Sequence, residues 1–282
     1  MERDVLLVPI ANPASAERLV ATAIDLSNAF DLAIDVLHVV RVPPQIPMSA
    51  APEIIESDTD FVFDAVEKIK ENGLSGTARV RYARSVSKGI ITATEDPSVR
   101  ITLLGWRGRP QRRDIVLGSY LDNVVNRAES DILIERVDEG ERSIGSICLP
   151  TAGGVHIGFA SRVADAIARE NDASIQVMHV VAPGTEETGM AESYLEEMLD
   201  EIGAGVDVDL KLIEHESVTD GILEQSAQHD LTIMGAAEEG MLSQALFGAI
   251  PERVGRDATS GVILAKRRLP LRERVPLLRR FL

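Results

Sequence analysis

The chain carries the same sequence pattern twice, and this internal repeat constrains its fold more than any single motif does. Four pairs of segments match in the same order: residues 5–9 with 147–150, 35–40 with 176–181, 85–91 with 217–223, and 103–105 with 233–235. The offset between partners falls from 141 to 130 positions, so the second copy is about 11 residues shorter. The difference arises after the second expected strand, where the first copy contains the proline-rich segment 42–48.

Within each copy, short apolar runs alternate with segments of helical periodicity. Residues 16–26 show such a helical pattern, and the strands of the first copy are expected near residues 4–9, 33–40, 77–83, 100–104 and 130–135. Strands that alternate with helices through short connections form parallel sheets covered on both faces. The sequence therefore predicts an α/β fold with two tandem, doubly wound, five-stranded parallel sheets. The expected domains are residues 1–139 and 144–268, with a polar linker between them and a basic tail at residues 269–282.

The composition agrees with two soluble globular domains. A chain of 282 residues with 45% hydrophobic content can form two cores of ordinary domain size. Its first residues are charged, and no apolar run approaches the roughly 18 residues of a membrane-spanning helix, so we expect a cytoplasmic protein. The single cysteine, Cys148, excludes a disulfide framework and a cysteine-rich zinc site, and its apolar neighbours indicate a core residue.

The charge of the chain limits its partners. A formal net charge of −16 repels a phosphate backbone, so we expect no general nucleic-acid binding. Only five of the 29 basic residues are lysines. An acidic, lysine-poor composition suits a high-salt cytoplasm, as in a halophile, and GC-rich coding produces the same preference for arginine.

One strand-to-helix connection carries three glycines and a hydroxyl at a defined spacing. Gly105 and Gly108 follow the apolar run 101–104, and Gly118 and Ser119 open a segment that is expected to form a helix. Glycines let main-chain amides approach an anion, and a helix start adds unpaired N–H groups and the positive end of the helix dipole. The pattern G-x2-G-x9-G-[ST] therefore predicts a phosphate-binding site.

This motif resembles the nucleotide-binding signature of the universal stress protein family, and the repeat resembles a tandem member of that family over residues 3–266. The resemblance implies domains of adenine nucleotide alpha hydrolase-like, Rossmann-like topology that bind ATP, AMP or another adenine nucleotide, with or without Mg²⁺. It implies contacts to phosphate from Gly105, Gly108, Gly118, Ser119 and the main chain of Tyr120, and to adenine from the main chain of Val39.

The resemblance also has consequences for assembly. Family members commonly pair through their last strands, which implies an intrachain pseudo-dimer through residues 132–134 and 262–264 and allows a homodimer beyond it.

Residues beside the motif modify the expected site. Ala11 stands where the family has an aspartate near the ribose, and Asn12 is the candidate to replace it. Arg107 and Arg109 belong to an arginine-rich loop between the glycines, where guanidinium groups suit phosphate oxygens; a solvated basic loop is the alternative. Trp106 either stacks on a base or packs beside the glycine turn.

The second copy lacks the decisive groups. Gly235 and Gly248 keep the spacing of Gly105 and Gly118, but Glu238 replaces the middle glycine and Ala249 replaces the hydroxyl. A carboxylate where a phosphate would lie opposes binding through like-charge repulsion. We therefore expect the first copy to bind the nucleotide and the second to be a non-binding structural partner.

These features favour an ATP-binding regulatory protein of the stress-response type. We expect no enzymatic activity, because the predicted site lacks an evident general base, nucleophile or pair of metal-binding carboxylates, and we expect no metal site in the protein itself. The alternative is a nucleotide-independent interaction module that regulates a partner such as a membrane transporter. The basic tail and the missing aspartate motivate that alternative.

Overall fold

The computed structural model of the chain describes residues 3–107, 119–137, 143–184, 188–237 and 247–269. These residues form one ten-stranded sheet with the order β3-β2-β1-β4-β5-β10-β9-β6-β7-β8. The strands are β1 (Val5–Pro9), β2 (Ala33–Arg41), β3 (Gly76–Ala83), β4 (Val99–Trp106), β5 (Asp131–Arg136), β6 (Ser146–Pro150), β7 (Ser174–Val181), β8 (Val208–Glu214), β9 (Leu231–Gly235) and β10 (Gly261–Lys266).

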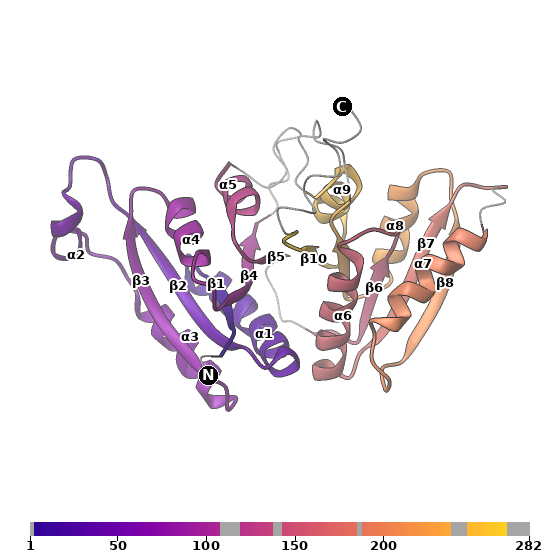
Figure 1. Ribbon diagram of the computed structural model, residues 1–282, viewed down its shortest axis with the longest axis horizontal. Helices are drawn as coiled ribbons and strands as arrows, with labels where there is room; N and C mark the ends of the chain where they lie inside the picture. Colours follow the sequence, from indigo (N-terminus) through magenta and orange to yellow (C-terminus); the bar gives the residue numbers. More distant parts are fainter. Residues whose placement is uncertain (1–2, 108–118, 138–142, 185–187, 238–246, 270–282) are drawn as a thin grey trace.

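Helices cover both faces of this sheet (Figure 1). They are α1 (Pro13–Phe30), α2 (Ala51–Ile54), α3 (Asp60–Glu71), α4 (Val86–Thr94), α5 (Ser119–Arg127), α6 (Ile157–Asn171), α7 (Thr188–Asp200), α8 (Val218–Ser226) and α9 (Ala249–Asp257). A short 3₁₀ helix, η1 (Met48–Ala50), precedes α2 and lies with it in the segment that lengthens the first copy. None of the helices in the described ranges is both long and apolar enough to cross a lipid bilayer.

The sheet consists of two parallel halves joined by one antiparallel pair of strands. We call β1–β5 with their helices the N-terminal lobe and β6–β10 with theirs the C-terminal lobe. Neighbouring strands within each lobe are parallel, whereas β5 and β10 are antiparallel, with Ile134 opposite Leu264. The predicted α/β fold with two tandem parallel sheets is confirmed, and so is the predicted pairing of the last strands.

The repeat extends to the way in which helices begin and end. Ser85 and Ser217 occupy equivalent N-cap positions, and each side chain accepts a hydrogen bond from the main chain three residues later. Asp31 and Asp172 end α1 and α6 in the left-handed conformation, with φ of 50° and 53°. The same local rules therefore stop and start the same elements in both lobes.

The hydrophobic core is continuous across the junction of the lobes. One cluster of buried side chains combines residues of α1, α3, α6 and α7 on one face, and a second combines those of α4, α5, α8 and α9 on the other. Cys148 lies in the second cluster, and burial raises the pKa of its thiol to about 12. This confirms the expectation that Cys148 is a core residue.

Two side chains of the N-terminal lobe attach it to α9. Trp106 is 4% exposed, and its ring lies against Gly255. Arg136 is also buried, and its guanidinium donates to the carbonyl oxygens of Gly255 at 3.0 Å, Ala258 at 2.8 Å and Ser260 at 2.5 Å. The last carbonyls of a helix lack intrahelical partners, so Arg136 satisfies the C-terminal end of a helix in the other lobe.

Candidate functional site

We call the region at the carboxyl ends of β1 and β4 the N-terminal crevice, because open α/β sheets have a crevice where the direction of winding reverses. The chain proceeds from β1 to β2 and β3 on one side and then returns to β4 and β5 on the other, so the direction of winding reverses between β1 and β4. The pairing of β1 with β2 ends at Pro9 and Leu37, while β2 and β4 continue beyond this level. Open α/β sheets bind ligands at such a switch point.

The loops after β1 and β4 meet across this crevice. Nη2 of Arg107 lies 3.5 Å from Oδ1 of Asn12, which also accepts a hydrogen bond from the main chain of Ser15 at 3.0 Å. Asn12 is therefore both the N-cap of α1 and a neighbour of Arg107, whose side chain is exposed to solvent. Two residues that the sequence places 95 positions apart come together on one side of the predicted site.

Helix α5 provides the other side of the site. It begins at Ser119, the helix start that the glycine pattern predicts. The hydroxyl of Tyr120 donates to the carbonyl oxygen of Gly105 at 3.4 Å, and burial raises the pKa of this phenol. The hydroxyl of Tyr120 therefore lies beside the end of β4, where the glycine motif begins.

Val39 contributes main chain rather than side chain. Its side chain is 8% exposed and belongs to the core cluster on the α4 and α5 face. The residue lies past the last pair between β1 and β2, next to His38, whose Nδ1 is 2.9 Å from the carbonyl oxygen of Ile10. The contact between adenine and the main chain of Val39 stays a prediction.

The remaining predicted residues, Gly108, Arg109 and Gly118, lie outside the described residues, as do Glu238 and the basic tail from residue 270 onward. The structure decides between the two interpretations of Trp106, packing and base stacking. Because its ring is buried against Gly255, the packing interpretation is right and base stacking is wrong.

A groove next to the crevice was not expected from the sequence. A cavity of about 230 Å³ opens between α1 and α3, with Pro13, Glu17, Phe61 and Lys68 among its lining residues. The ring of Phe61 lies edge-on to His38, with 5.1 Å between the ring centroids. The sequence signal for this groove is Phe61, an aromatic residue at the start of an amphipathic helix. Nothing in the sequence indicates that this helix lies beside His38.

The connection that follows β6 in the C-terminal lobe differs from its counterpart after β1. Three residues connect β1 to α1, whereas six connect β6 to α6, at residues 151–156. The last residue of this connection lies close to Gly235 in β9, since a Cβ atom on Gly235 would be 3.2 Å from the carbonyl carbon and oxygen of His156. The ring of His156 is buried and its Nδ1 accepts a hydrogen bond from the main chain of Arg267 at 3.1 Å.

Two further histidines, His179 and His215, also have structural contacts. His179 repeats the arrangement of His38, with Nδ1 2.7 Å from the carbonyl oxygen of Thr151, and His215 lies 3.5 Å from a carboxylate oxygen of Glu224. Within the described ranges, no three His, Cys, Asp or Glu side chains are grouped so that they could hold a metal ion.

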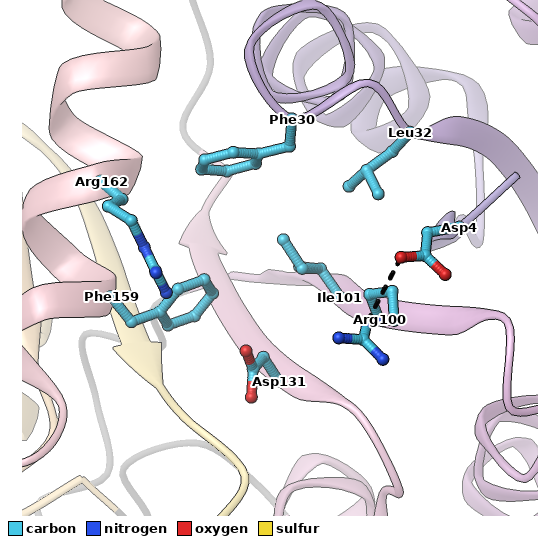
Figure 2. Close-up of a pocket in the computed structure, with 8 residues that line it drawn as sticks. All are labelled: Asp4, Phe30, Leu32, Arg100, Ile101, Asp131, Phe159 and Arg162. Atoms are coloured by element: carbon cyan, nitrogen blue, oxygen red, sulfur yellow. Dashed lines mark ion pairs between the residues drawn. The ribbon is translucent and has the colours of Figure 1, made fainter. Parts of the chain in front are cut away.

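A second cavity, of about 200 Å³, lies between the lobes, at the end of the sheet where the amino ends of β4 and β5 lie (Figure 2). Arg162 and Phe159 reach it from α6, and Asp131 and Ile101 reach it from the amino ends of β5 and β4. It is therefore separate from the predicted site, which lies at the carboxyl ends of the strands.

The carboxyl group of Asp131 in this cavity predicts a pH effect. Burial raises its pKa above the usual 3.8, despite a hydrogen bond from the main chain of Arg268 and the nearby charges of Arg267, Arg162 and Arg100. A raised pKa in the folded state removes stability as the pH rises through it. Asp131→Asn is therefore expected to match the native protein in urea unfolding below pH 3.8 and to become the more stable of the two as the pH rises.

Asp96 provides a control in which the pKa shift, and therefore the expected change in stability with pH, has the opposite sign. Hydrogen bonds from the hydroxyl and main chain of Ser98 lower the pKa of Asp96, so Asp96→Asn is expected to lose stability relative to the native protein as the pH rises. Equal pH profiles for Asp131→Asn and the native protein would contradict the assignment of a raised pKa to Asp131.

Comparison with known proteins gives a family match for the N-terminal lobe. Residues 2–136 match the model of the universal stress protein family. No curated protein matches the chain.

Solved structures with a similar fold include a universal stress protein from Archaeoglobus fulgidus DSM 4304, with 18% identity, 93% of this chain and 96% of that chain covered, and a TM-score of 0.65. The cytoplasmic domain of a prokaryotic cation chloride cotransporter shares 14% identity, covers 94% of this chain and 95% of its own, and has a TM-score of 0.61. A functionally unknown protein from Pseudomonas aeruginosa PAO1 shares 16% identity over 94% of this chain and 93% of its own, with a TM-score of 0.59. These similarities show a shared fold over nearly the whole length.

Proposed function

Because the chain belongs to the universal stress protein family, we propose that it is a cytoplasmic regulatory protein that binds one adenine nucleotide in its N-terminal lobe. ATP is the expected ligand, and AMP or another adenine nucleotide is the alternative. The C-terminal lobe is the structural partner of the binding lobe. The main support is the difference between the two switch points. Asn12 and Arg107 meet at the N-terminal one, whereas the main chain of His156 lies close to Gly235 at the C-terminal one.

The residues around the N-terminal crevice have the chemistry that an adenine nucleotide needs. The start of α5 at Ser119 offers unpaired main-chain N–H groups and the positive end of a helix dipole to phosphate. Arg107 adds a solvent-accessible guanidinium. Arg109, two residues further along the sequence, is the second arginine that we expect to contact phosphate. The main chain at Val39 offers directional hydrogen bonds to a base, while Asn12 offers an amide to the ribose.

No reaction is part of this proposal. Binding of the nucleotide, with Mg²⁺ as an optional companion of the phosphates, changes the charge and order of the crevice, and we expect a partner to sense that state. The expected signature is a stoichiometric complex without steady-state release of phosphate.

Isothermal titration of the full chain with ATP, ADP and AMP, each with and without Mg²⁺, tests the stoichiometry. We expect about one site per chain, and native mass spectrometry of the purified protein would identify a nucleotide retained from the cell. Two equal sites per chain would contradict the role assigned to the C-terminal lobe.

The second candidate function is a nucleotide-independent module that regulates a membrane transporter. The similarity in fold to the cytoplasmic domain of a cation chloride cotransporter supports it, since that protein uses this architecture beside a membrane. Absence of binding for every adenine nucleotide in the titration would favour this candidate over the first.

A further inference from the structure

Strand β8 ends the sheet on the side of the C-terminal lobe (Figure 1). In the described residues β8 pairs with β7 alone. Leu210 is 42% exposed and Leu212 is 38% exposed, and both project from the same face of the strand. A flat edge strand with exposed apolar side chains is a template for pairing with another strand.

The main-chain N–H and C=O groups of β8 that have no strand partner in the described part of the chain belong to the even-numbered residues, which include the two exposed leucines. The main-chain N–H of Ile175 donates to Asp207 at 2.8 Å, and that of His215 donates to Val181 at 3.0 Å. These two bonds direct the odd-numbered residues of β8 toward β7. The N–H and C=O groups of Val208, Leu210, Leu212 and Glu214 therefore point away from the sheet, because these groups alternate in direction along a strand.

The opposite edge of the sheet, β3, lacks these properties. Ala78 and Val80 occupy the positions equivalent to Leu210 and Leu212, and α3 packs on β3. The other face of β3 carries Arg79, which is paired with Asp35, and Arg81. Pairing of two β3 strands about residues 79–81 would place arginines opposite each other, so that edge is protected against self-association.

We propose that β8 forms a twofold antiparallel pair with β8 of a second copy of this chain, with Leu210 on the axis. In this register Leu210 faces its own copy and Val208 faces Leu212, and all of these residues have free main-chain groups to exchange. Asp209 lies opposite Lys211 of the second copy on the other face, which gives two ion pairs by symmetry. The Nζ of Lys211 donates to Gln225 of α8 at 2.8 Å, so this side chain exchanges that bond for the ion pair when the dimer forms.

The alternative registers, in which the pairing is shifted along the strand, are less favourable electrostatically. Placing Lys211 on the axis would bring two ammonium groups together, and placing Asp209 there would bring two carboxylates together. Placing Leu212 on the axis would set Leu210 against Glu214 and leave both ion pairs unmade. The pairing would join two ten-stranded sheets end to end and leave both N-terminal crevices accessible, so it does not depend on the proposed nucleotide site.

Disulfide trapping in the full chain tests the register directly. Residues opposite each other in a hydrogen-bonded antiparallel pair have Cα atoms about 5.5 Å apart, which a disulfide can span. Leu210→Cys is expected to form a covalent dimer under mild oxidation. Leu212→Cys is the matched control, since its two copies would lie about 13 Å apart, four residues along the strand. Cys148 is buried and does not compete.

Sedimentation equilibrium of charge variants supplies the second test. Asp209→Lys is expected to weaken the dimer about tenfold, because it replaces two ion pairs with two repulsive pairs, and the double variant Asp209→Lys, Lys211→Asp is expected to restore it. A monomeric native chain would overturn the proposal. So would a dimer that Asp209→Lys leaves unchanged, or equal trapping of Leu210→Cys and Leu212→Cys.

Discussion

Ser119→Asp is expected to reduce the affinity of the chain for an adenine nucleotide by at least about 100-fold. The substitution places a carboxylate at the first residue of α5, where the proposed site offers main-chain N–H groups to phosphate. A like charge at this point costs several kcal/mol of binding free energy, and each 1.4 kcal/mol is a factor of ten in the dissociation constant. Isothermal titration with ATP measures the loss.

The C-terminal lobe provides the matched control for this change. Ala249 is the first residue of α9 and corresponds to Ser119, and its side chain is exposed. Ala249→Asp therefore adds the same charge at the same structural position in the lobe that is proposed not to bind. We expect unchanged affinity for Ala249→Asp. Equal losses in the two variants would point to a general charge effect, and a loss in Ala249→Asp alone would reverse the assignment of the lobes.

Arg136→Met is expected to destabilise the junction of the lobes by about 3 kcal/mol or more. The substitution keeps much of the buried volume but removes three hydrogen bonds to carbonyl oxygens at and after the end of α9. Hydrogen bonds from a charged donor contribute about 1.5–3 kcal/mol each, and acceptors left buried without a partner add a further cost. Urea unfolding should show a lower midpoint and separate transitions for the two lobes.

A nearby arginine shows whether this loss is specific. Arg256 lies on α9 and pairs with Asp257 at 2.8 Å, with 31% of its side chain exposed. Surface pairs of this kind contribute less than about 1 kcal/mol, so Arg256→Met should change the midpoint little. Similar losses for Arg136→Met and Arg256→Met would show that the contacts across the junction are not the source of the effect.

The sequence predicts the fold well because its strongest signals are local and occur twice. Alternating apolar runs and helical patterns place the strands of the first copy within one or two residues of β1 to β5. The repeat then transfers that pattern to the second copy and leads to the pairing of β5 with β10. Cap residues such as Ser85 and Ser217 act through bonds within one turn, so they can be predicted from the chain alone.

The features that depend on distant partners could not be predicted in the same way. Arg136 donates to main-chain oxygens, which every residue has and which the sequence therefore does not distinguish. Trp106 packs on a glycine 149 positions away. At the candidate site, the sequence indicates Asn12 and Arg107 as separate residues, but their approach depends on sheet order. The connection from strand to helix is three residues longer after β6 than after β1, and a difference of that size is hard to recognise between an apolar run and a helical pattern.

The position of Trp106 gives this molecule a built-in optical reporter. It is the only tryptophan in the chain, it directly follows the first glycine of the phosphate motif, and its ring touches a helix of the opposite lobe. Emission excited at long ultraviolet wavelength therefore originates from one indole, situated where a ligand-induced displacement of the β4 terminus would be passed to α9. Any communication between the two halves can thus be followed spectroscopically in the unlabelled protein.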